Sequence, residues 1–296
     1  MVVDGGYTKV IAKATNCSFT VTSNTESASH KGIVGNFDKP EITSRGWNVS
    51  VDSLDVLDVG TLLGNVKSGT KFTLAFDEVA TADNQTAQAA AYQRMGDAYI
   101  NDLRFQWDNR SLSTKSIQFT GTGPLTHATD YRGSTVIDET TPAYTKGQNV
   151  RLQLFSGYSF VGAARQLALH VSVSLEEVTT KDTANSWQVQ EPVGINYDIT
   201  SNALVRSDEN ISSPAAAVGF SDILDASDSE QPVSWKIVNA SGINNRTSGT
   251  TIVQGTAQIT QMVANANNRQ VADYTTTLNG YGPYEIPVVA PPIVGD

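Results

Sequence analysis

The chain has 296 residues, a formal net charge of −10 and a charged fraction of 17%. This acidity argues against a surface that grips nucleic-acid phosphates, and no apolar run is long enough to span a membrane. The single cysteine excludes an intrachain disulfide, while the length suffices for two domains that each bury a core.

Alternation of apolar and polar residues predicts several strands in the first half. It is visible in residues 17–21, 47–51 and 72–76. Between the last two runs, residues 55–67 carry apolar side chains at helical spacing and stop before Ser68-Gly69. The first half is therefore predicted to be strand-rich, with one short flanking helix.

A hairpin is predicted next along the chain. Asn109-Arg110 stands midway between the strand-like runs 98–107 and 112–120, and Asn tolerates the left-handed backbone of a tight turn. Gly121-x-Gly123-Pro124 is predicted to end the second of these strands, because Pro cannot donate to the next ladder position.

The second half shows the same kinds of element. Residues 167–173 alternate and predict a half-buried strand, and residues 217–226 predict a second short helix. Residues 129–150, rich in Thr, Gly and Asp, are predicted to be a connector. The tail from residue 287 to 296 contains three prolines and predicts an extended C-terminal arm.

Sequence similarity between the halves indicates a tandem duplication. Gly96-x-Ala98-x-Ile100 returns 159 residues later as Gly255-x-Ala257-x-Ile259. In the same register Asn109-Arg110 returns as Asn268-Arg269, and Gly121-x-Gly123-Pro124 as Gly280-x-Gly282-Pro283. Earlier blocks repeat at offsets of 150 or 151 and the helix at 161, so about 11 extra residues lie around residues 207–217 of the second copy. Chance similarity of two strand-rich halves is the alternative.

The duplication predicts a mainly β protein of two β-sandwich or partial-barrel modules, each with one flanking short helix. Module 1 covers residues 1–128, a connector 129–150, module 2 residues 151–286, and an arm 287–296. Cys17 matches Leu167 of the other copy and is therefore predicted to be a buried core thiol.

No residue pattern supports catalysis or cofactor binding. His30, His127 and His170 lack metal-ligand spacing, and His170 is predicted to be a solvated surface imidazole. Nucleophile-elbow, phosphate-loop and Cys-x-x-Cys motifs do not occur. The sequence thus predicts a protein that is not an enzyme and has no cofactor and no metal site.

Three motifs in order resemble the major tail tube proteins of long-tailed, siphovirus-type bacteriophages. They are a Trp47-x-x-x-Val51-x-Ser53-Leu54 strand, a Lys67-x-Gly69-x-x-Phe72-x-Leu74 strand after the helix, and a closing Phe119-x-Gly121-x-Gly123 strand. The resemblance covers about residues 5–128. It reaches the second module through the internal repeat, where Lys-Ser-Gly becomes Asp228-Ser229-Glu230.

The resemblance implies a structural virion protein that polymerises into a hollow tail tube for DNA ejection. In that family six modules form a ring, so a duplicated chain needs three copies for a trimeric, pseudo-hexameric ring. Implied partners are further copies of the chain and the tape measure, tail terminator and distal tail proteins. DNA passes through the lumen without specific binding. The protein is expected in the virion tail, made in the host cytoplasm, with no membrane insertion.

Two alternatives stay open. One is the inner tube of a contractile tail or injection system; the other is a surface carbohydrate-binding or adhesion β-sandwich, which predicts exposed aromatic side chains clustered on one face. The residues most expected to serve assembly are Asn109, Arg110, Asn268 and Arg269, because both hairpin tips keep the Asn-Arg pair. Turn geometry explains the Asn but not the Arg, which can pair with acids of a neighbour.

Overall fold

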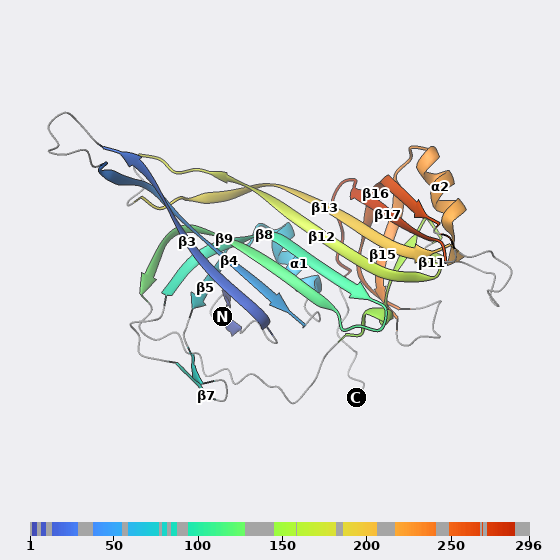
Figure 1. Ribbon diagram of the computed structural model, residues 1–296, viewed down its shortest axis with the longest axis horizontal. Helices are drawn as coiled ribbons and strands as arrows, with labels where there is room; N and C mark the ends of the chain where they lie inside the picture. The colour runs from blue at the N-terminus through green and yellow to red at the C-terminus, as the bar shows by residue number, and fades with distance from the viewer. Residues whose placement is uncertain are drawn as a thin grey trace, which may run out of the picture.

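The computed structural model describes residues 2–4, 7–9, 14–28, 38–54, 59–76, 79–81, 84–87, 94–127, 145–157, 159–181, 186–205, 217–240, 249–266, 268 and 271–287. These residues are mainly β, with two short α-helices, which confirms the predicted fold class. Fifteen strands form one continuous sheet, and β6 (Val79–Thr81) and β7 (Asn84–Ala87) pair separately (Figure 1).

The remaining elements of the first half lie between Val2 and His127. They are β1 (Val2–Asp4), β2 (Tyr7–Lys9), β3 (Ala14–Ser27), β4 (Pro40–Ser53), α1 (Val59–Lys67), β5 (Phe72–Phe76), β8 (Arg94–Asp108) and β9 (Thr114–His127). A short 3-10 turn, η2 (Gly147–Asn149), precedes the second half. Its elements are β10 (Val150–Leu154), β11 (Ser159–Val161), β12 (Ala164–Glu177), β13 (Gln190–Leu204), β14 (Ala217–Val218), α2 (Phe220–Asp228), β15 (Val233–Asn239), β16 (Thr250–Asn265) and β17 (Asp273–Gly280).

Strand order is the same in the two halves. The first half runs β3-β4-β9-β8-β5-β1-β2 and the second runs β12-β13-β17-β16-β15-β10-β11, with β14 added at its end. The two halves are joined because β12, the edge strand of the second half, also pairs antiparallel with residues 102–108 of β8, beyond the part that pairs with β5. Only the β11–β14 pair among the described strands of this sheet is parallel.

The pairing register repeats as well. Val49 of β4 lies between Phe19 and Phe119, and Ile199 of β13 lies between Leu169 and Leu278. These partners are related by the offsets 150 and 159 that the sequence shows. Register shifts recur too, at Ile100/Asp102 of β8 and at Ile259/Gln261 of β16. The sequence repeat therefore corresponds to a repeat of backbone geometry.

The hydrophobic core is continuous across the two halves. Helix α1 lies behind the sheet in Figure 1, and its Leu63 carbonyl accepts a 2.8 Å hydrogen bond from the Tyr284 hydroxyl. Lys67 at the end of α1 donates in turn to the Tyr284 carbonyl, at 2.9 Å. Because Tyr284 follows the last strand of the second half, the helix of the first half closes the core of the second.

Two of the repeated glycines make room for an aromatic ring. A Cβ at Gly121 would overlap the Trp47 indole, and a Cβ at Gly280 would overlap the Tyr197 ring. Trp47 and Tyr197 are themselves related by the offset of 150. The Gly-x-Gly repeat in the sequence thus reflects one packing requirement that both halves share.

Several sequence expectations need correction. Strand β9 continues to His127 instead of ending at Gly121-x-Gly123-Pro124. Its pairing with β8 steps from Asp97↔Thr122 to Met95↔Thr126. Residues 123–125 therefore form a bulge, and the strand continues beyond it. Helix α2 begins at Phe220, and residues 217–218 form a short strand instead of its first turn. The first predicted helix is described as α1 over Val59–Lys67, and its expected first residues, 55–58, lie outside the described residues. Cys17 is exposed, because the single chain leaves the outer edge of β3 uncovered.

Parts of the expected organisation lie outside the described residues, namely 128–144 of the connector, 206–216 of the insertion and 288–296 of the arm. The module boundaries remain predictions. No described helix is long and apolar enough to cross a membrane.

Candidate assembly interface

The seam between the two halves is an antiparallel strand pair. Seven consecutive pairs join β12 to β8, from Gln166↔Asp108 to Ser172↔Asp102. The side chains that point to the core from both strands are buried, including Leu167, Leu169 and Phe105. The seam therefore joins the two halves of the chain through a strand pair whose core side is buried.

A histidine links three strands on the opposite, polar face of this seam. His170 Nδ1 lies 2.8 Å from Asp198 Oδ1 of β13, and its Nε2 lies 2.7 Å from Asp102 Oδ2 of β8. Arg104 donates to the same Asp102 at 3.0 Å. The half-buried imidazole is thus a bridging group instead of the solvated side chain that the sequence predicted. Strand alternation placed it on the outer face correctly, but its partners depend on pairings between distant strands.

The predicted hairpin tip forms at one end of the seam. Asn109-Arg110 connects β8 to β9, and the Asn109 amide donates to the Arg165 carbonyl at 2.8 Å, which anchors the tip to β12. The left-handed residue is Arg110, with φ of 67°, and not Asn109 as expected. In the other tip Asn268 is an exposed turn residue, and Arg269 lies outside the described residues.

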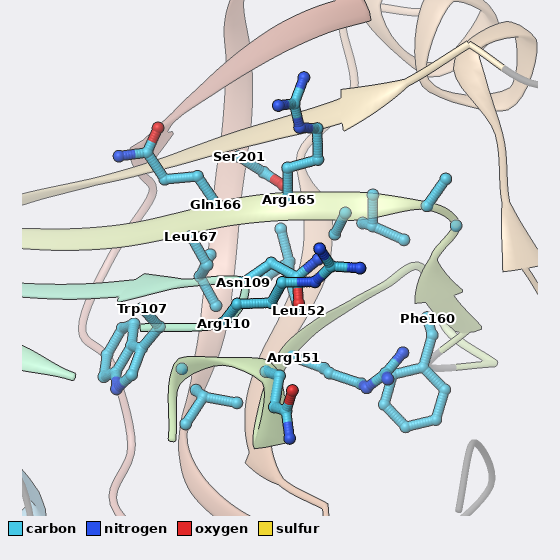
Figure 2. A pocket seen from close by; sticks show the side chains of 17 residues that line it. Trp107, Asn109, Arg110, Arg151, Leu152, Phe160, Arg165, Gln166, Leu167 and Ser201 are labelled. Carbon is cyan, nitrogen blue, oxygen red and sulfur yellow. The ribbon is translucent and has the colours of Figure 1, made fainter. Parts of the chain in front are cut away.

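A positively charged cavity of about 380 Å³ opens beside this tip (Figure 2). Arg110, Arg151 and Arg165 line it together with Phe160, Trp107 and further residues of β10 and β12. No ion pair joins Arg110 or Arg165 to a carboxylate among the described residues. An arginine guanidinium can bind a carboxylate through paired hydrogen bonds, and the assembly role of Arg110 stays a prediction.

Among the described strands, the two edges that correspond to those joined at the seam are unpaired. β3 pairs only with β4, and all fourteen of its residues are exposed, including Phe19 and Val21. Beyond Ile259, the outer side of β16 has no partner strand among the described residues, and residues 263–266 are exposed. In Figure 1, β3 lies to the left and β16 with α2 to the right, so the open edges stand at opposite sides of the molecule.

One face of the sheet is polar along both halves. Thr20, Asn48, Ser50 and Gln118 line a shallow hollow on this face in the first half. Thr200, Asn202 and Thr275 continue it in the second, where Asn202 donates to the Thr275 hydroxyl at 3.0 Å. Charged side chains on the face include Asp52, Asp102, Asp198 and Asp273 against Arg104. Hydroxyls, amides and an excess of carboxylates make a surface with little attraction for phosphate.

The described residues also bear on the expectations for a metal site and for the tryptophans. Within the described ranges no group of three or more His, Cys, Asp and Glu side chains could hold a metal ion. Three of the four tryptophans, Trp47, Trp107 and Trp235, are buried in the core. These three rings are therefore core residues, as the sequence predicted.

Comparison with known proteins gives only weak structural similarity. No protein-family model and no curated protein matches the sequence. A chain of the virion of a native gene transfer agent particle is similar over 48% of this chain and 98% of its own length, with 12% identity and a TM-score of 0.38. A chain from the tail of an empty gene transfer agent particle, with C6 symmetry, covers the same shares with 14% identity and a TM-score of 0.37.

Proposed function

We propose that the protein is a structural virion protein, the major tail tube subunit of a long-tailed phage, built by tandem duplication of one tube module. The observation that carries the proposal is the repeated strand order with one seam closed inside the chain and one matching pair of edges left open. A chain of this kind assembles with itself. The module boundaries are those of the sequence repeat, residues 1–128 and 151–286.

Open edges at opposite sides favour a closed ring. Pairing the left edge of one copy with the right edge of the next is a heterologous contact, which generates a ring when the rotation closes. Closure also removes the exposed strand edges that otherwise promote aggregation. Three chains supply six modules, so the ring is trimeric and pseudo-hexameric, with its strands in one continuous barrel.

The polar face of the sheet is assigned to the lumen. The opposite face is occupied by the core and the two helices, so it lies on the outside of the barrel. Stacked rings then give a conduit lined by hydroxyls, amides and carboxylates, through which DNA slides without specific binding. In this proposal the tube contacts tape measure, tail terminator and distal tail proteins in the virion tail.

Electron microscopy of purified protein, with rotational symmetry read from end-on views, tests the proposal. Hollow stacked rings of three chains with near-sixfold appearance are expected. Rings of six chains would keep the tube but make the second module an outer decoration. Dispersed monomers, with and without added tail-tip material, would contradict the proposal. A sheath bound around the tube would instead identify the inner tube of a contractile tail.

A further inference from the structure

We infer that residues Cys17 to Thr22 of β3 pair antiparallel with residues Ala266 to Gln261 at the β16 end of a second copy, in one defined register. Cys17 lies opposite Ala266, Phe19 opposite Ala264, and Val21 opposite Met262. The inference rests on the proposed ring, and it adds the strand, the direction and the register of the contact between chains.

The seam inside the chain supplies the template. β12 corresponds to β3 at an offset of 150, and the distal part of β8 corresponds to β16 at 159. Leu167 lies opposite Trp107, Leu169 opposite Phe105, and Val171 opposite Leu103. Applying the two offsets to each pair gives the three pairs between chains. The template applies to β3 and β16 because each pairs with its other neighbour in the same register as its counterpart, β12 or β8. The register shift after Ile259 of β16 also has its counterpart in β8.

Exposure of β3 marks the surface that a second copy would cover. Phe19 is 40% exposed and Val21 is 47% exposed, whereas their counterparts Leu169 and Val171 are each 1% exposed. The counterpart of Cys17, Leu167, is likewise buried. Large apolar side chains on an open strand edge are an aggregation hazard unless a partner strand covers them.

Helix α2 shows the complementary surface on the other side of the chain. Leu63 of α1 is fully buried, and its carbonyl accepts the hydrogen bond from Tyr284 of the second half. Its counterpart in α2, Leu224 at an offset of 161, is 41% exposed. By the same geometry α2 of one copy covers the Leu125 region of the next, since Leu125 corresponds to Tyr284 at 159. Leu224 and the apolar side chains of β3 are thus exposed where the internal seam buries their counterparts.

The polar face of the seam between chains differs from the seam within the chain. In the seam between chains, the positions that match His170, Asp198 and Asp102 hold Thr20, Asn48 and Gln261. The bridged histidine and its carboxylates are therefore confined to the covalent seam, and neutral hydrogen-bonding groups line the seam that forms between chains. This difference separates the two seams chemically although their backbone pairing is the same.

The native cysteine allows a direct test. Ala266→Cys places a second thiol opposite Cys17 of the neighbour, and cross-strand Cα separations of about 4.5–5.5 Å lie within the range that a disulfide bridges. Asn265→Cys is the matched control, because the adjacent side chain points to the other face of the strand. Mild oxidation of assembled rings, followed by non-reducing electrophoresis, reads the result. Ala266→Cys combined with Cys17→Ser confirms which thiols react.

Ala266→Cys is expected to give a ladder that ends at a covalent trimer, and Asn265→Cys is expected to stay monomeric on the gel. A second outcome is that rings or tubes form normally while a disulfide forms through position 265 or through neither position. That outcome would overturn the register but leave the proposed tube intact. Cross-linked chains without hollow rings support the strand pairing and contradict the tube. If neither cross-linked chains nor hollow rings form, both the strand pairing and the proposed tube are contradicted.

Reactivity of Cys17 in the unmodified protein gives a second readout. The thiol is exposed in the single chain, so a maleimide reagent should label the monomer readily. Assembly should slow labelling by at least about tenfold, because the thiolate loses access to the reagent. Equal labelling of monomer and assembled rings would overturn the inference.

Discussion

Glycines at matched positions of the two halves leave space that an aromatic ring fills. A methyl group at Gly121 would overlap the Trp47 indole, so we expect Gly121→Ala to destabilise the fold by about 1–3 kcal/mol through overpacking. Gly157 has no neighbouring heavy atom within 4 Å of an added Cβ, and Gly157→Ala should change stability by less than about 0.5 kcal/mol. Denaturant unfolding measures both. Equal effects of the two substitutions would contradict the packing role of Gly121.

Buried tyrosines give the fold a dependence on alkaline pH. Burial, with Asp222 nearby, raises the pKa of Tyr274 to about 12, above the usual value of 10. Stability from its neutral hydroxyl is therefore present below pH 10 and is lost as the pH rises through about 12. The Tyr274 hydroxyl has no hydrogen-bond partner among the described residues. Tyr274→Phe should thus preserve stability at neutral pH and reduce the alkaline loss, as followed by thermal unfolding across pH.

Tyr284 is the contrasting case. Its hydroxyl donates to the Leu63 carbonyl at 2.8 Å inside the core. We expect Tyr284→Phe to lower the free energy of unfolding by about 1 kcal/mol or more at neutral pH, because a buried carbonyl loses its donor. Chemical denaturation beside Tyr274→Phe measures the difference. A Tyr284→Phe variant as stable as Tyr274→Phe would show that this hydrogen bond adds nothing to the contact of α1 with the second half.

At the scale of elements, alternation and turn residues predicted the strands and the β8–β9 hairpin correctly, because these signals are local. Three features depend on which strands pair, and local patterns do not encode that. Strand β9 passes Pro124 by a bulge, His170 meets carboxylates from two other strands, and Cys17 is exposed at an open edge. The prediction that Cys17 is buried followed from its match with Leu167. That match describes a covered strand, and the single chain leaves β3 uncovered.

The arginines of the two hairpin tips, Arg110 and Arg269, are predicted to serve assembly. Arg110→Ala combined with Arg269→Ala should weaken ring or tube formation and leave the monomer folded, because a main-chain hydrogen bond from Asn109 anchors the first tip. Replacing both arginines by Lys keeps the charge and tests whether charge or the bidentate guanidinium matters. Sedimentation measures assembly and circular dichroism the fold. Unimpaired tubes from the double Ala variant would remove these residues from the interface.

At the scale of the whole molecule, the proposed ring would contain two kinds of contact between modules. The seam within the chain forms on folding, whereas the proposed seam between chains would form on association. Only the second would therefore depend on protein concentration. The two modules are free to diverge for the same reason: the bridged His170 lies at the covalent seam, and its counterpart Thr20 lies on the strand that a second chain would cover.

The proposal that the polar face of the sheet lines the lumen can be tested by adding positive charge to that face. Ser50 and Thr200 stand at matched positions on this face, in β4 and β13. Ser50→Lys with Thr200→Lys adds two positive charges per chain to the face assigned to the lumen in the proposed tube. Tubes assembled with duplex DNA should then retain nuclease-resistant DNA, and retention should fall steeply with salt. Ser50→Gln with Thr200→Gln is the neutral control. Nuclease-sensitive DNA bound to Lys tubes would place this face on the outside, because a nuclease reaches only external DNA.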